Sequence, residues 1–148
     1  MVQRLLVVTG LLLLAARPGT ATAEDRALQV VQFEKPARGD QDRGVFPAIL
    51  KPTVEALARA IDSADVSKLR EFESKEVPAE VIVDFWKAER GDGALKLNAS
   101  YYPARKFGAL AAPAYILITK AGGSNFCSIK IEKANKLMID SCMEEYGG

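Results

Sequence analysis

Two carboxylates stand where the sequence would otherwise be apolar, and they are the residues best placed for chemistry. Glu89 falls between the apolar positions of a helical pattern, and Asp140 falls between two apolar positions of an alternating segment. A carboxyl group in apolar surroundings has a raised pKa and can act as a general acid or anchor a ligand. Aromatic rings nearby can line such a pocket. The predicted ligand-binding residues are therefore Glu89, Asp140, Trp86 and Tyr101.

The same four residues also have ordinary structural interpretations. Glu89 stands in the last turn of its helix, from which it can turn outward, and Asp140 can stand at a sheet margin beside a Lys or Arg. Aromatic residues such as Trp86 and Tyr101 are usual in hydrophobic cores. The pattern therefore names candidate ligand contacts but no catalytic residue.

No histidine occurs in the chain. Its absence excludes Ser-His-Asp and Cys-His nucleophiles, His-ligated zinc and the commonest acid–base group near neutral pH. Two cysteines alone cannot complete a structural zinc site, and the carboxylates do not have the spacing of a calcium loop. We predict neither a metal nor a cofactor.

The first residues predict export. A basic start at Arg4 precedes the apolar residues 5–16, and residues 21–23 have the small-x-small pattern of a cleavage site. We interpret residues 1–23 as a signal peptide, so the protein is expected to be secreted or periplasmic. The net charge of +1 argues against binding to nucleic acid. No later segment has the length of a spanning helix, so no membrane contact is expected after cleavage.

An oxidising compartment gives Cys127 and Cys142 a structural interpretation, because a cysteine pair in a small exported domain is most simply a disulfide. Residues 114–142 alternate between apolar and polar types and are interrupted by turns rich in Gly and Asn, which predicts a three-stranded antiparallel meander. Centring the two turns at 122/123 and 134/135 places Cys127 opposite both Ile118 and Cys142. The predicted core face carries Ala114, Ile116, Ile118, Cys127, Ile129, Ile131, Met138, Asp140 and Cys142.

Before residue 91, apolar residues recur at the spacing of a helix and no longer at every second position. Pro52 and Pro78 each begin a helix, and a break at Asp62–Asp65 separates the first from a short second helix. Residues 95–102 alternate and predict one more strand. Residues 24–50 form an N-terminal extension, with an edge strand at 28–33 and a loop at 38–44. Residues 51–148 are expected to form a single α+β domain in which helices pack on a curved antiparallel sheet that ends in the meander.

The segment Leu57–Leu69 resembles the opening of the NTF2-like, cystatin-related superfamily. In that superfamily a helix, a short break and a second helix precede a bent sheet, and the matching residues here are Ala60, Asp65 and Leu69. The resemblance implies a cone-shaped fold whose interior can form a ligand pocket. It implies no activity, because the acidic and His dyads of the enzymatic members have no His to match here.

These observations favour an exported, non-enzymatic binding or interaction module. Its partner is expected to be another protein or a small apolar ligand held between helices and sheet. One alternative is a lyase, isomerase or hydrolase that uses Glu89 or Asp140. Another is a secreted inhibitor or immunity protein acting through a surface loop, either residues 91–93 or the loop from Pro103 to Pro113.

Overall fold

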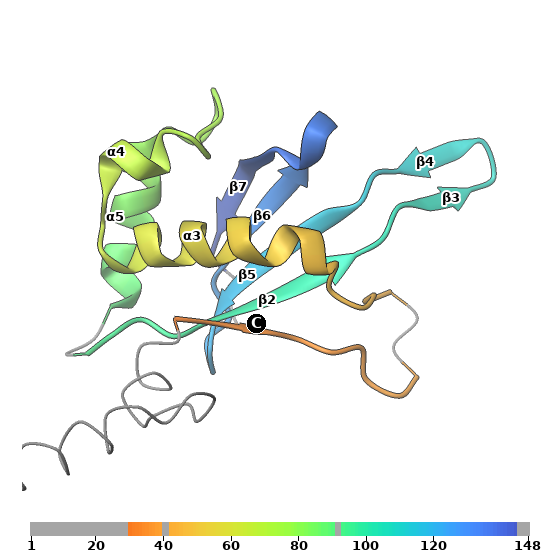
Figure 1. Cartoon of the computed structure of the whole chain (residues 1–148), viewed down its shortest axis with the longest axis horizontal. Coiled ribbons are helices and arrows are strands. Elements are labelled where there is room, and N and C mark those ends of the chain that lie inside the picture. Colours follow the sequence, from red (N-terminus) through yellow and green to blue (C-terminus); the bar gives the residue numbers. More distant parts are fainter. Residues whose placement is uncertain (1–29, 40–41, 91–92, 145–148) are drawn as a thin grey trace, which may run out of the picture.

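The computed structural model describes residues 30–39, 42–90 and 93–144. It is an α+β structure in which the helices cover one face of a five-stranded sheet, and a two-stranded arm projects from one end (Figure 1). The predicted signal peptide and Gly91 lie outside the described residues. The elements are β1 (Val31–Phe33), η1 (Ala48–Leu50), α3 (Lys51–Asp62), α4 (Val66–Leu69), α5 (Ala79–Glu89), β2 (Leu97–Tyr102), β3 (Arg105–Phe107), β4 (Leu110–Ala112), β5 (Tyr115–Lys120), β6 (Phe126–Ile131), η2 (Lys133–Asn135) and β7 (Leu137–Met143).

The helices begin where the sequence predicts. Pro52 lies in the first turn of α3, where its missing N–H needs no partner, and Pro78 immediately precedes α5. Between them, the Asp65 side chain accepts a hydrogen bond from the backbone N–H of Lys68 and so caps α4. The break between α3 and α4 is therefore a capped turn, and it changes the direction of the chain so that α4 and α5 lie at the far end of α3.

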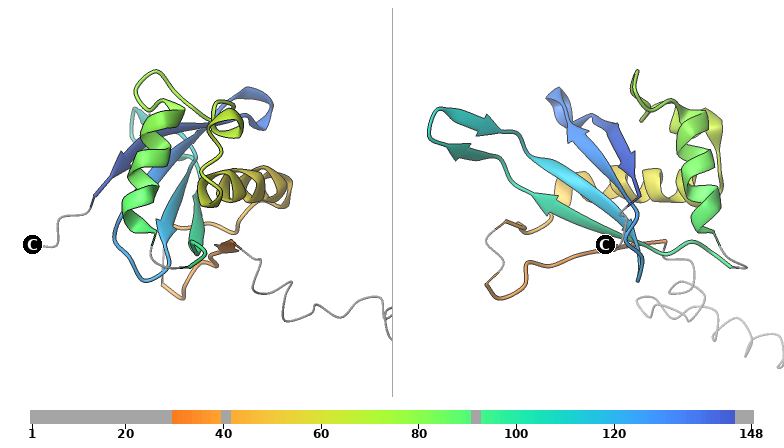
Figure 2. Two further views of the ribbon diagram at one scale, coloured as in Figure 1. Left: turned by 90° about the vertical axis from the view of Figure 1, so that its left-hand side faces the viewer. Right: turned by 180° about the vertical axis from the view of Figure 1, so that it is seen from behind.

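The helices lie against one face of the sheet (Figure 2). One hydrophobic core fills the space between them. The N-terminal extension contributes to it, because Val31, Phe46 and Leu50 are all buried. The other core side chains come from the helices and the sheet. They occupy the helical positions that face the sheet and every second position of the strands. The largest fully buried side chains are Trp86, Leu57, Leu69, Ile82, Leu97, Ile116, Ile118, Ile129, Leu137 and Ile139.

The strand order is β1-β2-β5-β6-β7. Strand β1 runs parallel to β2, and the other neighbouring strands are antiparallel. The sheet is therefore mixed, and the prediction of an antiparallel sheet is wrong for β1. A parallel pair requires a long crossover, and here the three α-helices form that crossover. The edge position predicted for the strand at 28–33 is confirmed for its described residues.

The predicted pairing of the first hairpin in the meander is confirmed. Ile118 lies opposite Cys127, and Ile116 lies opposite Ile129. The turn is centred where the sequence places it, and Gly122 adopts a positive φ of 76° that other residues rarely adopt. These four facing residues are completely buried, so the hairpin presents one continuous face to the helices.

The second hairpin is confirmed at its cysteine end and shifted by one residue at its turn. Cys127 and Cys142 face each other and form a disulfide, with their Cα atoms 4.0 Å apart. Towards the turn, Ile129 pairs with Ile139, because the loop is centred on Ala134 and contains three residues. A β-bulge at Asp140 absorbs the difference, since this residue opposes none in β6.

The bulge corrects two predicted positions on the core face. Leu137 and Ile139 are 1% and 0% exposed, whereas Met138 is only half-buried and Asp140 is exposed. The prediction that Met138 and Asp140 point into the core is therefore wrong. The bulge lets Ile139 face the core while Cys142 still lies opposite Cys127, an arrangement that strict alternation forbids.

The segment from Pro103 to Pro113, predicted as a loop, is a β-hairpin that continues the β2–β5 pair. Tyr102 lies opposite Tyr115, and three residues further along each strand Arg105 lies opposite Ala112, so the register is unbroken. The two prolines interrupt the ladder because they have no N–H to donate. Beyond them the ribbon leaves the sheet and projects as an arm, hereafter residues 103–113 (Figure 1).

Removing the disulfide should lower the free energy of unfolding by about 2 to 3 kcal/mol, because the bridge spans a separation of 15 residues. The double variant C127A/C142A tests this in urea titrations, with the fluorescence of the single, buried Trp86 as the signal. Wild-type protein under reducing conditions is the matched control and should be destabilised similarly. Equal stability of the variant and the oxidised protein would contradict the stabilising role of the bridge.

Deleting Asp140 should be tolerated, because strand β7 then alternates regularly with Ile139 and Cys142 still on the core face. We expect a loss of less than about 1 kcal/mol in the free energy of unfolding, since the exposed ion pair to Lys130 contributes little. Deleting Met138 is the control. It forces Leu137 or Ile139 out of the core and should cost about 3 kcal/mol or more. Similar losses in both deletions, measured in urea, would refute the bulge.

Candidate functional site

Glu89 lies at the carboxyl end of α5 and joins the helix to the turn between β5 and β6. Its carboxylate accepts a hydrogen bond from the side-chain amide of Asn125 and lies 4.0 Å from Nζ of Lys120. The side chain is 20% exposed. Its hydrogen bond and its ion pair are both to polar side chains, and they hold α5 against the end of the sheet.

Trp86, one turn earlier in α5, is a core residue. It is 1% exposed, and the ring of Phe85 meets it edge-on at a centroid distance of 5.1 Å. Its indole N–H is buried without a hydrogen-bond partner among the described residues. With this degree of burial, Trp86 has almost no surface to offer a ligand.

Tyr101 and Asp140 lie apart from α5 and from each other. The rings of Tyr101, in β2, and Phe46 are arranged edge to face, with their centroids 6.2 Å apart. Asp140 is exposed on β7, with two strands between it and β2, and lies 3.9 Å from Nζ of Lys130. Lys130 alternates with the buried Ile129, so this ion pair is on the sheet face that the helices leave open.

The two predicted carboxylates therefore do not converge. Lys120, the ionic neighbour of Glu89, shares the side of β5 that carries Ile118 and faces the helices. Lys130, the ionic neighbour of Asp140, points from the opposite face. The structure brings together only Glu89 and Trp86, which lie on one helix, and the four predicted ligand-binding residues form no common site.

A tyrosine pair missed in the sequence lies on the open face of the sheet. The rings of Tyr102 and Tyr115 stack with a centroid distance of 4.8 Å and an interplanar angle of 5°. Burial raises the pKa of the Tyr115 hydroxyl, and the nearby Tyr102 and Asp42 raise it further, while Arg105 opposes them. The register of β2 against β5 creates this pair, so alternation within each strand alone could not reveal it.

The two most exposed large apolar side chains in the described strands lie on the arm. Phe107 and Leu110 face each other across its turn and are 59% and 74% exposed. An open pocket of about 330 Å³ lies on the same arm, lined by Ala104, Arg105, Lys106, Ala111, Ala112 and Pro113. The sequence predicted a loop in place of this arm. Pairing the strand predicted at 95–102 with the first strand of the meander, and continuing that pairing past the two prolines, would have found it.

The segment that precedes α3 lies beside the base of the arm. The backbone N–H of Gly44 donates to the carbonyl oxygen of Tyr101 at 2.8 Å, and Asp42 forms an ion pair with Arg105. Residues Val45 and Ile49 of this segment are 77% and 70% exposed. Of the six exposed large hydrophobic side chains among the described residues, four therefore belong to this segment and the arm.

Within the described ranges, no group of three or more His, Cys, Asp or Glu residues is arranged to hold a metal ion. No helix in that part of the chain has the length and apolar character needed to cross a membrane. No family model, curated protein or solved structure matches the chain.

Stability should fall with rising pH above the ordinary tyrosine pKa of 10.0, because the unfolded chain then releases the Tyr115 proton while the folded protein retains it. The effect is absent below that pKa and develops as the pH rises towards the raised pKa of the folded state. We expect Tyr115→Phe to reduce the slope of the unfolding free energy against pH above pH 10.0. An unchanged slope in urea titrations would show that burial does not perturb this hydroxyl.

Proposed function

We propose that this protein is an exported, non-enzymatic interaction module that contacts its partner through the arm. The observation that carries the proposal is the pair Phe107 and Leu110, which face each other at the tip of a projecting hairpin and are both largely exposed. Large apolar side chains gathered at one place on a surface are typical of contact sites.

Export is supported by the sequence and by the cysteines. The N-terminal pattern is that of a signal peptide, and a disulfide between Cys127 and Cys142 persists most readily in an oxidising compartment. The proposal of a secreted or periplasmic protein follows from these two independent observations.

An acid–base enzyme has less support. Such chemistry needs catalytic groups that converge on one cavity. Glu89 is engaged by Asn125 and Lys120 on the helical side of the sheet, whereas Asp140 is exposed on the other side. A pocket between helices and sheet likewise lacks support from its predicted lining, because Trp86 is 1% exposed.

A secreted inhibitor or immunity protein is one form of the proposed function, since such a protein would also act through a projecting surface element. The arm occupies the segment from Pro103 to Pro113 that this alternative named. Membership of the NTF2-like, cystatin-related superfamily stays a prediction.

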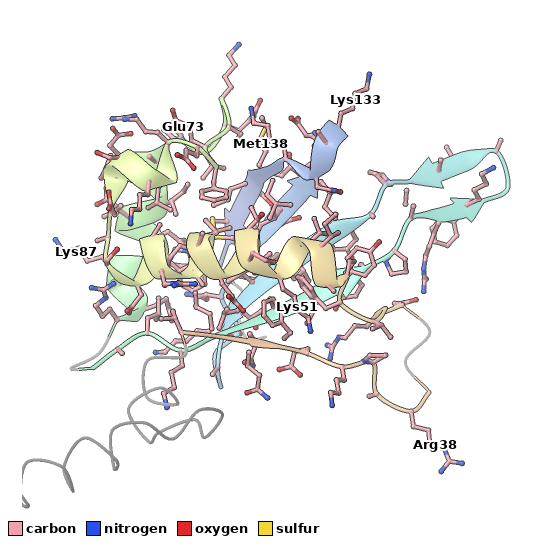
Figure 3. All side chains as sticks on the ribbon, in the orientation of Figure 1. Arg38, Lys51, Glu73, Lys87, Lys133 and Met138 are labelled. Atoms are coloured by element: carbon pink, nitrogen blue, oxygen red, sulfur yellow. A yellow bond between two sulfur atoms is a disulfide. The ribbon has the colours of Figure 1, made fainter. Side chains whose placement is uncertain are left out.

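The proposal can be tested by photo-cross-linking in the source organism. The photoreactive residue p-benzoylphenylalanine replaces Phe107 in one variant and Lys87 in a second. Lys87 is exposed on α5 and lies at the end of the molecule away from the arm (Figure 3). We expect irradiation to give a discrete adduct at position 107 and none at position 87.

Two results would contradict the proposed function. One is the absence of any protein or lipid adduct at position 107 while the protein is folded and exported. The other is the same adduct at both positions, which would indicate random encounters and not contact through the arm. Unchanged emission from the buried Trp86 would confirm that both variants are folded.

A further inference from the structure

We infer that the arm end of the molecule docks on an anionic lipid surface. The arm end comprises residues 42–51 and 103–113. The ion pair between Asp42 and Arg105 joins the two segments, and the hydrogen bond from Gly44 to Tyr101 holds the first segment beside the base of the arm. This inference rests on the proposed function, because it names what the arm contacts. It departs from the sequence-based expectation that the exported protein makes no membrane contact.

Charge is distributed unevenly along the molecule. The arm end has four basic residues and one acidic residue, whereas residues 65–90, which include α4 and α5, have five basic and seven acidic residues. In Figure 3, Arg38 projects on the side of the arm end, and Glu73 and Lys87 lie at the opposite end with α4 and α5. The molecule therefore presents its positive end together with its exposed apolar residues.

The arm itself has two basic residues, Arg105 and Lys106, and no acidic residue. Arg105 forms an ion pair with Asp42 at the base of the arm, and the exposed Lys106 places a positive charge next to the tip. A surface that attracts this part of the protein must therefore be negatively charged. Basic residues near an anionic membrane strengthen binding, and the effect decays within a Debye length.

The tip of the arm has the chemistry needed at a membrane interface. Phe107 and Leu110 share one face of the ribbon because they are directly paired, while the exposed Lys106 stands one residue behind the tip. Apolar side chains of interfacial segments enter the boundary between headgroups and acyl chains, to a depth of about 5 to 10 Å. Insertion of the tip would bring the Lys106 ammonium group to the level of the lipid phosphates.

The segment beside the base of the arm also has exposed apolar residues. Val45 and Ile49 lie in the segment that accompanies β2 and β3, and both are more than two-thirds exposed. The arm itself carries no acidic side chain that would be repelled by phosphate. Apolar residues backed by basic ones and without acidic ones match an anionic lipid surface better than a neutral protein surface.

A second copy of the chain is the less favourable occupant. A dimer formed through two arm tips would bury Phe107 and Leu110 of both copies, but it would also bring the two Lys106 side chains close together without an acidic residue of either arm between them. Like charges in contact oppose such an interface. An anionic lipid surface covers the same apolar pair and is attracted by the same charges.

Vesicle flotation tests the inference with the mature chain that begins at Glu24. The probes are vesicles of phosphatidylcholine alone and vesicles of phosphatidylcholine and phosphatidylglycerol in equal parts. We expect the protein to float only with the vesicles that contain phosphatidylglycerol, and to be released by high salt. Binding to both kinds of vesicle equally, or to neither, would overturn the inference.

Two variants and one control locate the contact. F107S/L110S should weaken partition by at least about tenfold, because it removes the inserting apolar groups. Lys106→Gln should weaken it about fivefold through the loss of one positive charge. Val81→Ser removes a 48% exposed apolar side chain from α5 and should leave partition unchanged. Equal losses in F107S/L110S and Val81→Ser would overturn the assignment to the arm.

Two further measurements separate the possible failures. Sedimentation without vesicles should show a monomer, and a dimer that F107S/L110S abolishes would identify a second copy as the occupant. If vesicles fail to bind while position 107 still cross-links to a protein, the lipid inference fails and the proposed function stands. If position 107 gives no adduct and vesicles do not bind, both fail.

Discussion

Burial of a single sheet face beneath the helices is the constraint on which the rest of the structure depends. Side chains alternate along a strand, so a slip of one residue would carry an entire apolar row to the solvent side. Ile116, Ile118, Cys127 and Ile129 are all fully buried, which fixes β5 against β6. The disulfide then follows from register, because Cys142 must face Cys127 once β7 is aligned.

The same constraint explains why the bulge occurs at Asp140. The three-residue loop sets Leu137 and Ile139 on the core face, whereas the cysteine pair requires Cys142 there as well. Three positions separate Ile139 from Cys142, an odd number that an unbroken strand cannot accommodate. Inserting one unpaired residue solves this, and because that residue is polar it is directed to solvent.

Beyond Pro103 and Pro113 no helix covers the strands, so the need to bury one sheet face does not determine which residues occur there. The arm keeps the register of β2 and β5 but has no helix against either face, so its apolar side chains stay exposed. An isolated two-stranded ribbon has marginal stability. Here the continuous register, the Tyr102–Tyr115 stack and the Asp42–Arg105 ion pair hold its base. The proposed contact element is thus joined to the sheet through its base.

Local rules were sufficient to predict the helices, the first hairpin and the cysteine pairing, because proline positions, capping by Asp65 and strict alternation act between near neighbours in sequence. They failed for the position of Asp140. A two-residue loop with a regular strand and a three-residue loop with a bulge both place Cys142 opposite Cys127, and only the packing of the core distinguishes them. They failed likewise for the arm, because Pro103 and Pro113 indicate a loop, although they only interrupt the ladder between the arm and strands β2 and β5. Burial of Trp86 and the separation of Glu89 from Asp140 were decided by how α5 packs on the sheet, because packing between distant segments determines which polar groups can meet.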